Sequence, residues 1–102
     1  MIALRWAEPA RADFLGIIEW ITRENPPAAR RIGRRLLAVV ERLGVYPHLG
    51  RPGRVPDTRE QTIPGLPYLV VYALAGDEGA EAVVILRVLH GAMDWPSSKP
   101  NE

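Results

Sequence analysis

The stretch YLVVYAL, residues 68–74, decides the fold of this 102-residue chain. It consists of residues that favour β-strands, and it lacks the polar alternation of a strand with one wet face. A second stretch of this kind, AVVILRVLH, covers residues 82–90. Between them, Gly76-Asp77-Glu78-Gly79 is typical of a hairpin loop. The two stretches therefore predict neighbouring antiparallel strands at the centre of a sheet.

Two helices are predicted upstream of these strands. The first begins at Glu8-Pro9, where a proline in the first turn costs no hydrogen bond. Apolar residues then recur at the spacing that places them on one face of a helix: Phe14, Ile17, Ile18 and Ile21. Asn25-Pro26-Pro27 ends this helix and begins a second over residues 27–45, because a residue before proline avoids the α region and Asn caps helices well. So short a connection predicts an antiparallel helical hairpin.

The remaining elements are short. Alternation over residues 2–6 predicts a strand that must join the sheet, and residues 58–63 predict a polar strand. Residues 46–56 contain three prolines and two glycines and predict a long loop. The order is then β-α-α-β-β-β, an α+β fold with an antiparallel sheet and the N-terminal helical hairpin packed on one face. We expect one domain over residues 1–96 and a polar C-terminal tail over residues 97–102.

Composition excludes several classes of protein. The chain has no cysteine, which excludes disulfides and thiol catalysis, and its two histidines lie far apart, so we expect no metal site. No apolar run reaches the length of a membrane span, and the N-terminus carries charge where a signal peptide would not, so a cytoplasmic protein is expected. Net charge is +1, but residues 26–54 hold seven arginines and a single acid, Glu41. Such a segment can meet an acidic protein or a nucleic acid.

Several short motifs, spread over most of the chain, resemble the ParE/RelE superfamily of bacterial type II toxin–antitoxin toxins. Those motifs are Pro9-Ala10, Asp13-Phe14, Ile17, Trp20-Ile21, Pro47, Gly50, Arg51-Pro52, the stretch 67–72 and the stretch 85–92. The resemblance implies a toxin without cofactor or metal, held inactive in a hetero-oligomer by a cognate antitoxin. An acidic, ParD-like antitoxin would suit the basic middle segment.

The superfamily implies two different activities. ParE-like toxins inhibit DNA gyrase, whereas RelE-like toxins are ribosome-dependent mRNA endonucleases. Leu69 stands where a RelE-like nuclease usually carries Arg, and no Tyr follows the last strand. The low net charge also suits a ribosome-binding nuclease poorly. We therefore favour gyrase inhibition, in which no residue is catalytic. If the chain is RelE-like instead, the expected catalytic residues are Arg87 and His90. A non-toxic, degenerate member of the superfamily is the third alternative.

Four residues are predicted to contact the target: Arg87, Met93, Asp94 and Trp95. Strand alternation puts Arg87 on the same side as Ile85 and Leu89, away from His90 unless the strand bulges. The alternatives are that Arg87 pairs with an acid such as Glu60 on a neighbouring strand, that Trp95 plugs the core, and that His90 hydrogen-bonds a carbonyl at the strand end.

The second predicted helix carries a basic face that we expect to bind the antitoxin. Its members are Arg30, Arg31, Arg34 and Arg35. A plain solvated face is the alternative. Trp20 flanks the apolar stripe of the first helix and is expected in the core, because aromatic side chains bury large areas. Tyr68 and Tyr72 share a strand face, with their hydroxyls either lining a groove or lying at the rim of the helix contact.

Overall fold

The two apolar stretches form neighbouring antiparallel strands, as predicted. The computed structural model describes residues 2–76 and 82–91. Strand β4 covers Tyr68–Ala75 and strand β5 covers Ala82–His90, paired over their whole lengths. The predicted hairpin loop, residues 76–79, lies almost wholly outside the described residues.

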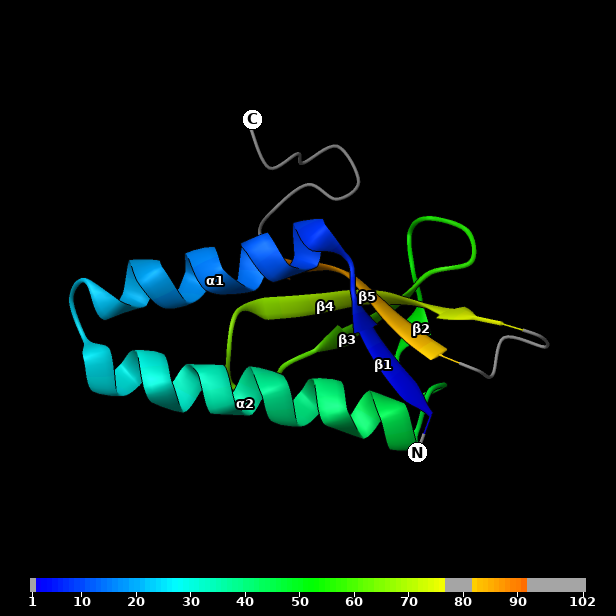
Figure 1. The fold of residues 1–102 in the computed structure, drawn as a ribbon, viewed down its shortest axis with the longest axis horizontal. Helices are drawn as coiled ribbons and strands as arrows, with labels where there is room; N and C mark the ends of the chain where they lie inside the picture. The colour runs from blue at the N-terminus through cyan, green and yellow to red at the C-terminus, as the bar shows by residue number, and fades with distance from the viewer. Residues whose placement is uncertain (1, 77–81, 92–102) are drawn as a thin grey trace.

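The sheet has five strands in the order β1-β5-β4-β3-β2 (Figure 1). Strand β1 covers Ala3–Trp6, β2 covers Arg51–Pro52 and β3 covers Arg59–Thr62. Two expectations are corrected here. The sheet is mixed, because β1 pairs parallel to β5 while every other pairing is antiparallel. The predicted loop over residues 46–56 also contributes a two-residue strand, β2, at the edge of the sheet.

The two helices begin and end close to the predicted positions. Helix α1 covers Glu8–Thr22 and helix α2 covers Pro26–Val45. The predicted cap is confirmed, because Asn25 Oδ1 accepts a hydrogen bond of 3.1 Å from the Ala28 backbone N–H. This bond satisfies one of the donors that the first turn of a helix leaves without an intrahelical partner.

The helices pack closely at one glycine and then extend past the sheet. A Cβ at Gly33 of α2 would lie 3.1 Å from Ile18 Cδ1 of α1, so the Ile18 side chain would have to shift slightly to admit a larger residue. Figure 1 shows the connection between the helices projecting beyond the strands. The hairpin therefore presents part of its surface without support from the sheet.

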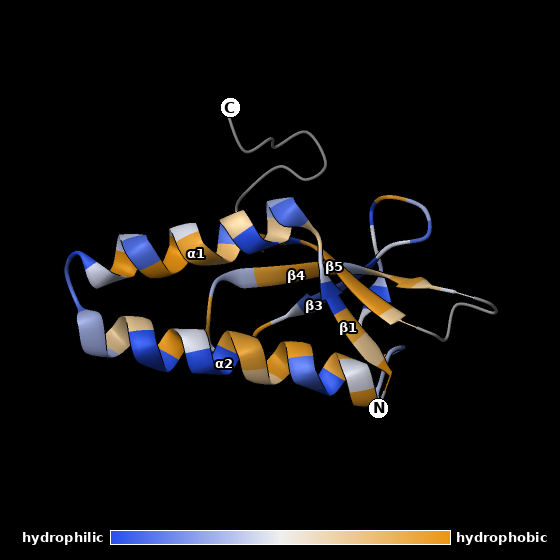
Figure 2. Cartoon of the chain, in the orientation of Figure 1, coloured by the Kyte–Doolittle hydropathy of each residue, from blue (hydrophilic) through white to orange (hydrophobic). Residues whose placement is uncertain are grey.

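The main core lies between the helical hairpin and one face of the sheet. It contains Leu36, Val40 and Leu43 from α2 and the side chains of β4 and β5 that face them, such as Val70 and Ile85. Figure 2 shows how strongly hydrophobic β4 and β5 are beside the mixed helices. The opposite face of the sheet holds a smaller buried cluster that contains no helix residue: Leu69, Val71 and Leu89, with Leu86 packed against them.

A β-bulge in β5 corrects the predicted alternation around Arg87. Tyr72 pairs with Ile85, but the preceding residue of β4, Val71, pairs with Arg87, so Leu86 is an extra residue. One extra residue reverses the face of the side chains that follow it. Ile85 therefore belongs to the main core and Leu89 to the smaller cluster, not to one side as expected.

Candidate functional site

Arg87 lies inside the molecule, bound to Asp13 of α1. Its Nε and one terminal nitrogen donate to the two carboxylate oxygens over 2.7 and 3.0 Å. Asp13 also accepts from the Val88 backbone N–H at 3.0 Å. Because β1 ends opposite Ile85, the carboxylate occupies the edge of β5 where a neighbouring strand is missing. Hydrogen bonding to Asp13 raises the pKa of Arg87 above its ordinary value.

This arrangement differs from both expectations for Arg87. Only 7% of the residue is exposed, so a target cannot reach the guanidinium without breaking the contact with Asp13. Its partner is also not Glu60, which lies on β3 and pairs with other arginines. Arg87 in this structure fixes α1 against β5, and it is not a surface group.

His90 is exposed at the end of β5 and packs edge-on against Tyr68, with 5.9 Å between ring centroids. Both line an open hollow of about 380 Å³ beside α1, together with Asp13 and Trp20. Leu69 is buried in the smaller cluster. The hollow therefore brings His90 near the Asp13 carboxylate, which is already bound to Arg87. Among the residues that the structure describes, its lining contains no Arg or Lys that could bind a phosphate.

The prediction that Trp20 belongs to the core is wrong. The residue is 72% exposed, and its side chain borders the hollow beside α1. The stripe of Phe14, Ile17, Ile18 and Ile21 already covers the face of α1 that meets the rest of the molecule. Trp20 lies about 100° around the helix from Ile21, off the face that carries the stripe.

The four arginines of α2 that we expected to bind the antitoxin are all exposed but form two separate pairs. Arg30 and Arg34, one turn apart, border a hollow of about 410 Å³ between the helices whose floor includes Phe14 and Ile18. Arg35 instead donates to the Pro64 carbonyl oxygen, in the turn between β3 and β4. The pair at the hollow thus combines an apolar floor with two cations.

Hydrogen bonds to a side chain of β4 hold the loop between α2 and β2 against the sheet. The Tyr72 hydroxyl accepts from the Gly50 N–H and donates to the Pro47 carbonyl oxygen, both over 2.8 Å. Burial raises the pKa of Tyr72 above its ordinary value. A Cβ at Gly50 would lie 2.8 Å from the Tyr72 ring, so this close contact requires glycine. The Tyr72 hydroxyl is therefore buried and neither lines a groove nor lies at a rim; Tyr68 remains half-buried.

Glu60 is a buried carboxylate on the sheet face away from the helices. It accepts from the Arg54 backbone N–H at 2.9 Å, and ion pairs join it to Arg54 at 3.4 Å and Arg51 at 3.5 Å. Burial by itself raises the pKa of Glu60, but the contacts with both arginines outweigh burial and hold the pKa below its ordinary value. The carboxylate thereby ties β2 and the following loop to β3.

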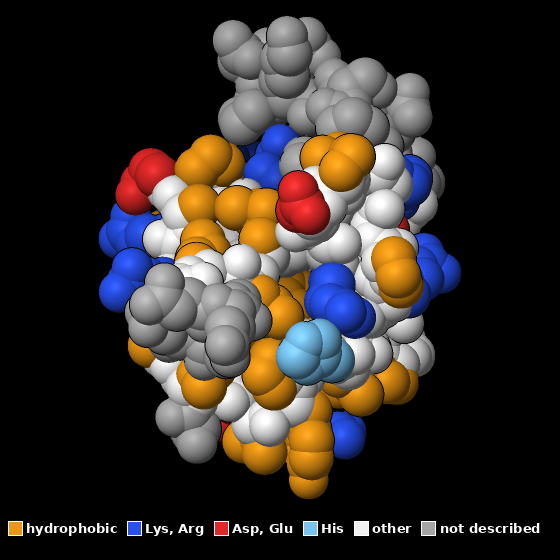
Figure 3. Space-filling view, turned by 90° about the vertical axis from the view of Figure 1, so that its right-hand side faces the viewer, with side chains coloured by type: hydrophobic (Ala, Val, Ile, Leu, Met, Phe, Trp, Pro, Cys, Tyr) orange, Lys and Arg blue, Asp and Glu red, His pale blue; other side chains and the backbone are white. Residues whose placement is uncertain are grey.

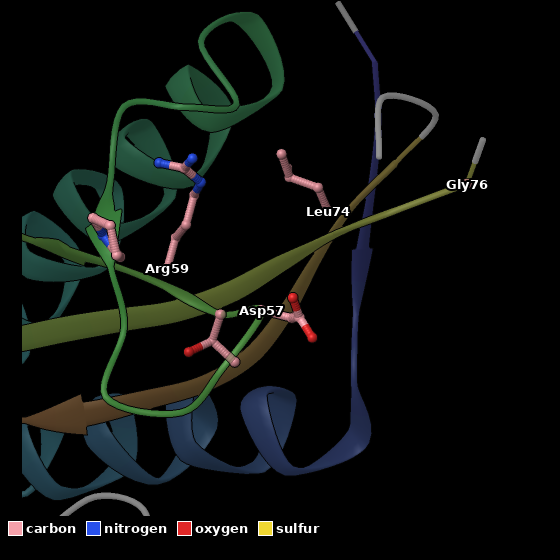
Figure 4. Close-up of a pocket in the computed structure, with 6 residues that line it drawn as sticks. Asp57, Arg59, Leu74 and Gly76 are labelled. Carbon is pink, nitrogen blue, oxygen red and sulfur yellow. The ribbon is translucent and has the colours of Figure 1, made fainter. Parts of the chain in front are cut away.

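A further hollow, of about 530 Å³, is bordered by Asp57, Arg59, Leu74 and Gly76 (Figure 4). Figure 4 shows the Arg59 and Leu74 side chains extending to the same side of the strands. Arg59 donates to the carbonyl oxygens of Gly50 at 2.7 Å and His48 at 3.3 Å, so its charge supports the loop. Within residues 2–76 and 82–91, no three side chains of metal-binding type come together, and no helix is long and apolar enough to cross a bilayer.

Sequence reasoning missed Asp13 as the partner of Arg87 and Tyr72 as the anchor of the loop. Asp13 did carry a signal, because a lone carboxylate directly beside the apolar stripe of α1 needs a partner when the helix packs. Met93, Asp94 and Trp95 lie outside the described residues, so their predicted role stays a prediction.

Comparison with protein families gives one model that matches residues 4–95, described as the ParE toxin of the type II toxin–antitoxin system parDE. Among curated relatives, a putative toxin Y4kP of Sinorhizobium fredii is 37% identical over 95 residues, covering 91% of this chain and 92% of the relative. Toxin RelE1 of Caulobacter vibrioides is 36% identical over 84 residues, covering 80% and 85%.

Solved structures agree on the fold. The chromosomal ParDE system of P. aeruginosa contains a chain with a TM-score of 0.76 and 25% identity, covering 88% of this chain and 96% of that one. The RelBE2 complex of Mycobacterium tuberculosis gives a TM-score of 0.61 at 25% identity, covering 87% and 96%. The intact E. coli RelBE complex gives 0.60 at 14% identity, covering 86% and 94%, and supports the fold alone.

Proposed function

Because this chain belongs to the ParE toxin family of type II toxin–antitoxin systems, we propose that it arrests growth by inhibiting DNA gyrase through protein contact, without a catalytic residue. Its site of action is then the cytoplasm. The observation that carries the proposal is the enclosure of Arg87 by Asp13. Cleavage of mRNA requires a cation that contacts the phosphate and stabilises the negative charge of its transition state. The Arg87 guanidinium instead binds the Asp13 carboxylate.

A RelE-like activity is the second candidate, and the similarity to a protein named toxin RelE1 favours it. Cleavage of mRNA through the ribose 2′-OH needs a general base, an acid and a cation together. His90 offers one titratable group at the end of β5, but Leu69 is buried and Arg87 is occupied. These contacts make gyrase inhibition the better supported of the two.

We further propose that an acidic, ParD-like antitoxin binds the hollow between α1 and α2. The similar structures from P. aeruginosa and E. coli named above belong to toxin–antitoxin systems, which supports an antitoxin partner and a hetero-oligomer. The hollow has an apolar floor for apolar side chains, and Arg30 and Arg34 at its border for carboxylates. Arginine suits this role because its fork of donors matches a carboxylate.

Inducible expression in a bacterial host tests the activity. Growth arrest with loss of gyrase supercoiling activity, and with intact mRNA, is expected. The same strain co-expressing a cognate antitoxin serves as the control and should grow normally. Rapid cleavage of ribosome-bound messages with supercoiling unchanged would replace the proposal with the RelE-like activity, and normal growth without antitoxin would leave a non-toxic member.

A further inference from the structure

Three apolar side chains lie exposed together where α2 ends. Val45, Tyr46 and Leu49 are 53%, 57% and 43% exposed, and we call them the α2-end patch. They border an open hollow of about 580 Å³ with Arg42, Pro47 and His48. Figure 3 looks onto this end of the molecule, where hydrophobic side chains gather around a histidine and a basic side chain. A cluster of exposed apolar side chains on a small domain often marks a protein contact.

The backbone that carries the α2-end patch is held firmly in place. Tyr72 binds the loop at Pro47 and Gly50, and Arg59 binds it at the carbonyl oxygens of His48 and Gly50. The Tyr46 backbone N–H also bonds to the Arg42 carbonyl oxygen at 2.7 Å. Binding costs less free energy when the contacting loop is already ordered, so the patch is prepared for a partner.

The charge around the α2-end patch selects the chemistry of that partner. The Arg42 guanidinium lies over the Tyr46 ring, 5.9 Å from its centroid. A contact of this kind engages the face of the guanidinium, whereas its N–H donors point outward in the guanidinium plane, where a carboxylate can accept from them. The described residues that line the hollow include Arg42 and His48 and no acid. An acidic segment with an aliphatic or aromatic side chain complements such a surface.

The α2-end patch is also separate from the hollow that we assign to the antitoxin. Leu37, the lining residue of that hollow nearest the end of α2, lies eight residues before Val45, which corresponds to about 12 Å at the usual rise per residue. An antitoxin segment in the hollow between the helices therefore leaves room for a second partner at the end of α2.

We propose that the α2-end patch is a contact surface for the protein that the toxin inhibits, and that it receives an acidic, apolar segment of that protein. The inference rests on the proposed function only in taking the chain to be a toxin that acts by protein contact. It does not require the target to be gyrase.

The test uses Tyr46→Ser and Leu49→Ser in the full chain, with Leu15→Ser as the matched control. Leu15 is an equally exposed leucine, 48%, but it lies on α1 outside the patch. Each variant is expressed from a titratable promoter, and the amount of toxin that gives half-maximal growth arrest is measured. Antitoxin affinity and thermal stability are measured on the purified proteins.

We expect each patch variant to need at least about tenfold more toxin for growth arrest, as for truncation of an interface hot spot. Leu15→Ser should match the wild type, and antitoxin affinity and stability should stay within the range of that control. Full toxicity of both patch variants overturns the inference, as does a matching loss of antitoxin affinity or of stability, or a wild-type chain that does not arrest growth. Growth arrest of the wild type with unaffected gyrase would reject only the proposed target.

Discussion

At the scale of single residues, Asp13 explains why β5 can carry a buried charged side chain, Arg87. Its carboxylate satisfies two donors of Arg87 and one backbone N–H of the same strand. Removing one partner of a buried ion pair leaves the other charge uncompensated, which is far costlier than losing an exposed pair.

Asp13→Ala should therefore lower the free energy of unfolding by about 3–5 kcal/mol. Glu8→Ala is the control, because it removes an exposed pair with Arg11 on the same helix and should cost less than about 1 kcal/mol. Urea denaturation measures both. The double variant Asp13→Leu/Arg87→Met should regain much of the loss, since it removes both charges at similar volume. Equal, small losses for Asp13→Ala and Glu8→Ala would show that the pair contributes little.

Glu60 gives the domain a dependence on acid pH. Its pKa in the folded protein is below the ordinary value of 4.5. A carboxylate with a lowered pKa adds stability that is fully present above its unfolded pKa and lost as the pH falls through its folded pKa. Glu60→Gln should then cost about 1–2 kcal/mol at pH 7, through loss of charged hydrogen bonds. The difference from the wild type should shrink steadily below pH 4.5 in chemical denaturation experiments, and a constant difference down to pH 2 would exclude this role.

At the scale of elements, α2 contributes both to the main core and to the charged surface. Its apolar stripe fills the main core, while Arg30 and Arg34 border the hollow toward α1 and Arg35 binds the turn after β3. Side chains four residues apart lie on one helix face, and neighbours in sequence do not. Arg30 therefore shares a face with Arg34, and Arg31 shares a face with Arg35.

Charge reversal should separate these two pairs. Arg34→Glu is expected to weaken antitoxin binding at least about tenfold, because truncating one partner of a desolvated charge pair costs about 2–5 kcal/mol. Arg31→Glu is the matched control on the same helix, away from the lining of the hollow, and should change affinity much less. Titration calorimetry at two salt concentrations measures both. Equal effects of the two variants would indicate long-range attraction by the whole basic face.

At the scale of the whole molecule, Trp95 remains a predicted part of the toxic surface with Met93 and Asp94. Trp95→Ala should abolish growth arrest while leaving stability and antitoxin binding unchanged, because Trp is frequent at interface hot spots. If Trp95 instead plugs the core, the same change should lower the melting temperature by several degrees, as a loss of about 1 kcal/mol does in a small domain. Growth assays and thermal melts on one preparation separate the two, and a stable, fully toxic variant would exclude both roles.

Local patterns were enough to predict α1, α2, β1, β3, β4 and β5 and their order, because periodicity, capping and proline placement act within a few residues. The helix boundary at Asn25 and the two central strands followed from such short-range rules. The resemblance to the ParE/RelE superfamily likewise used short motifs in sequence order, and the family assignment confirmed it.

The contacts that place the candidate sites could not be predicted in the same way. Asp13 and Arg87 are 74 residues apart in the sequence, and Tyr72 and Gly50 are 22 apart. The bulge at Leu86 comes from the register between two strands, and the exposure of Trp20 from what packs beside α1. Residue patterns carry little information about such pairings, because many side chains could satisfy a buried charge or hydroxyl. Packing selects one of them, since the chain must bury its apolar faces and bond every polar group it buries at the same time.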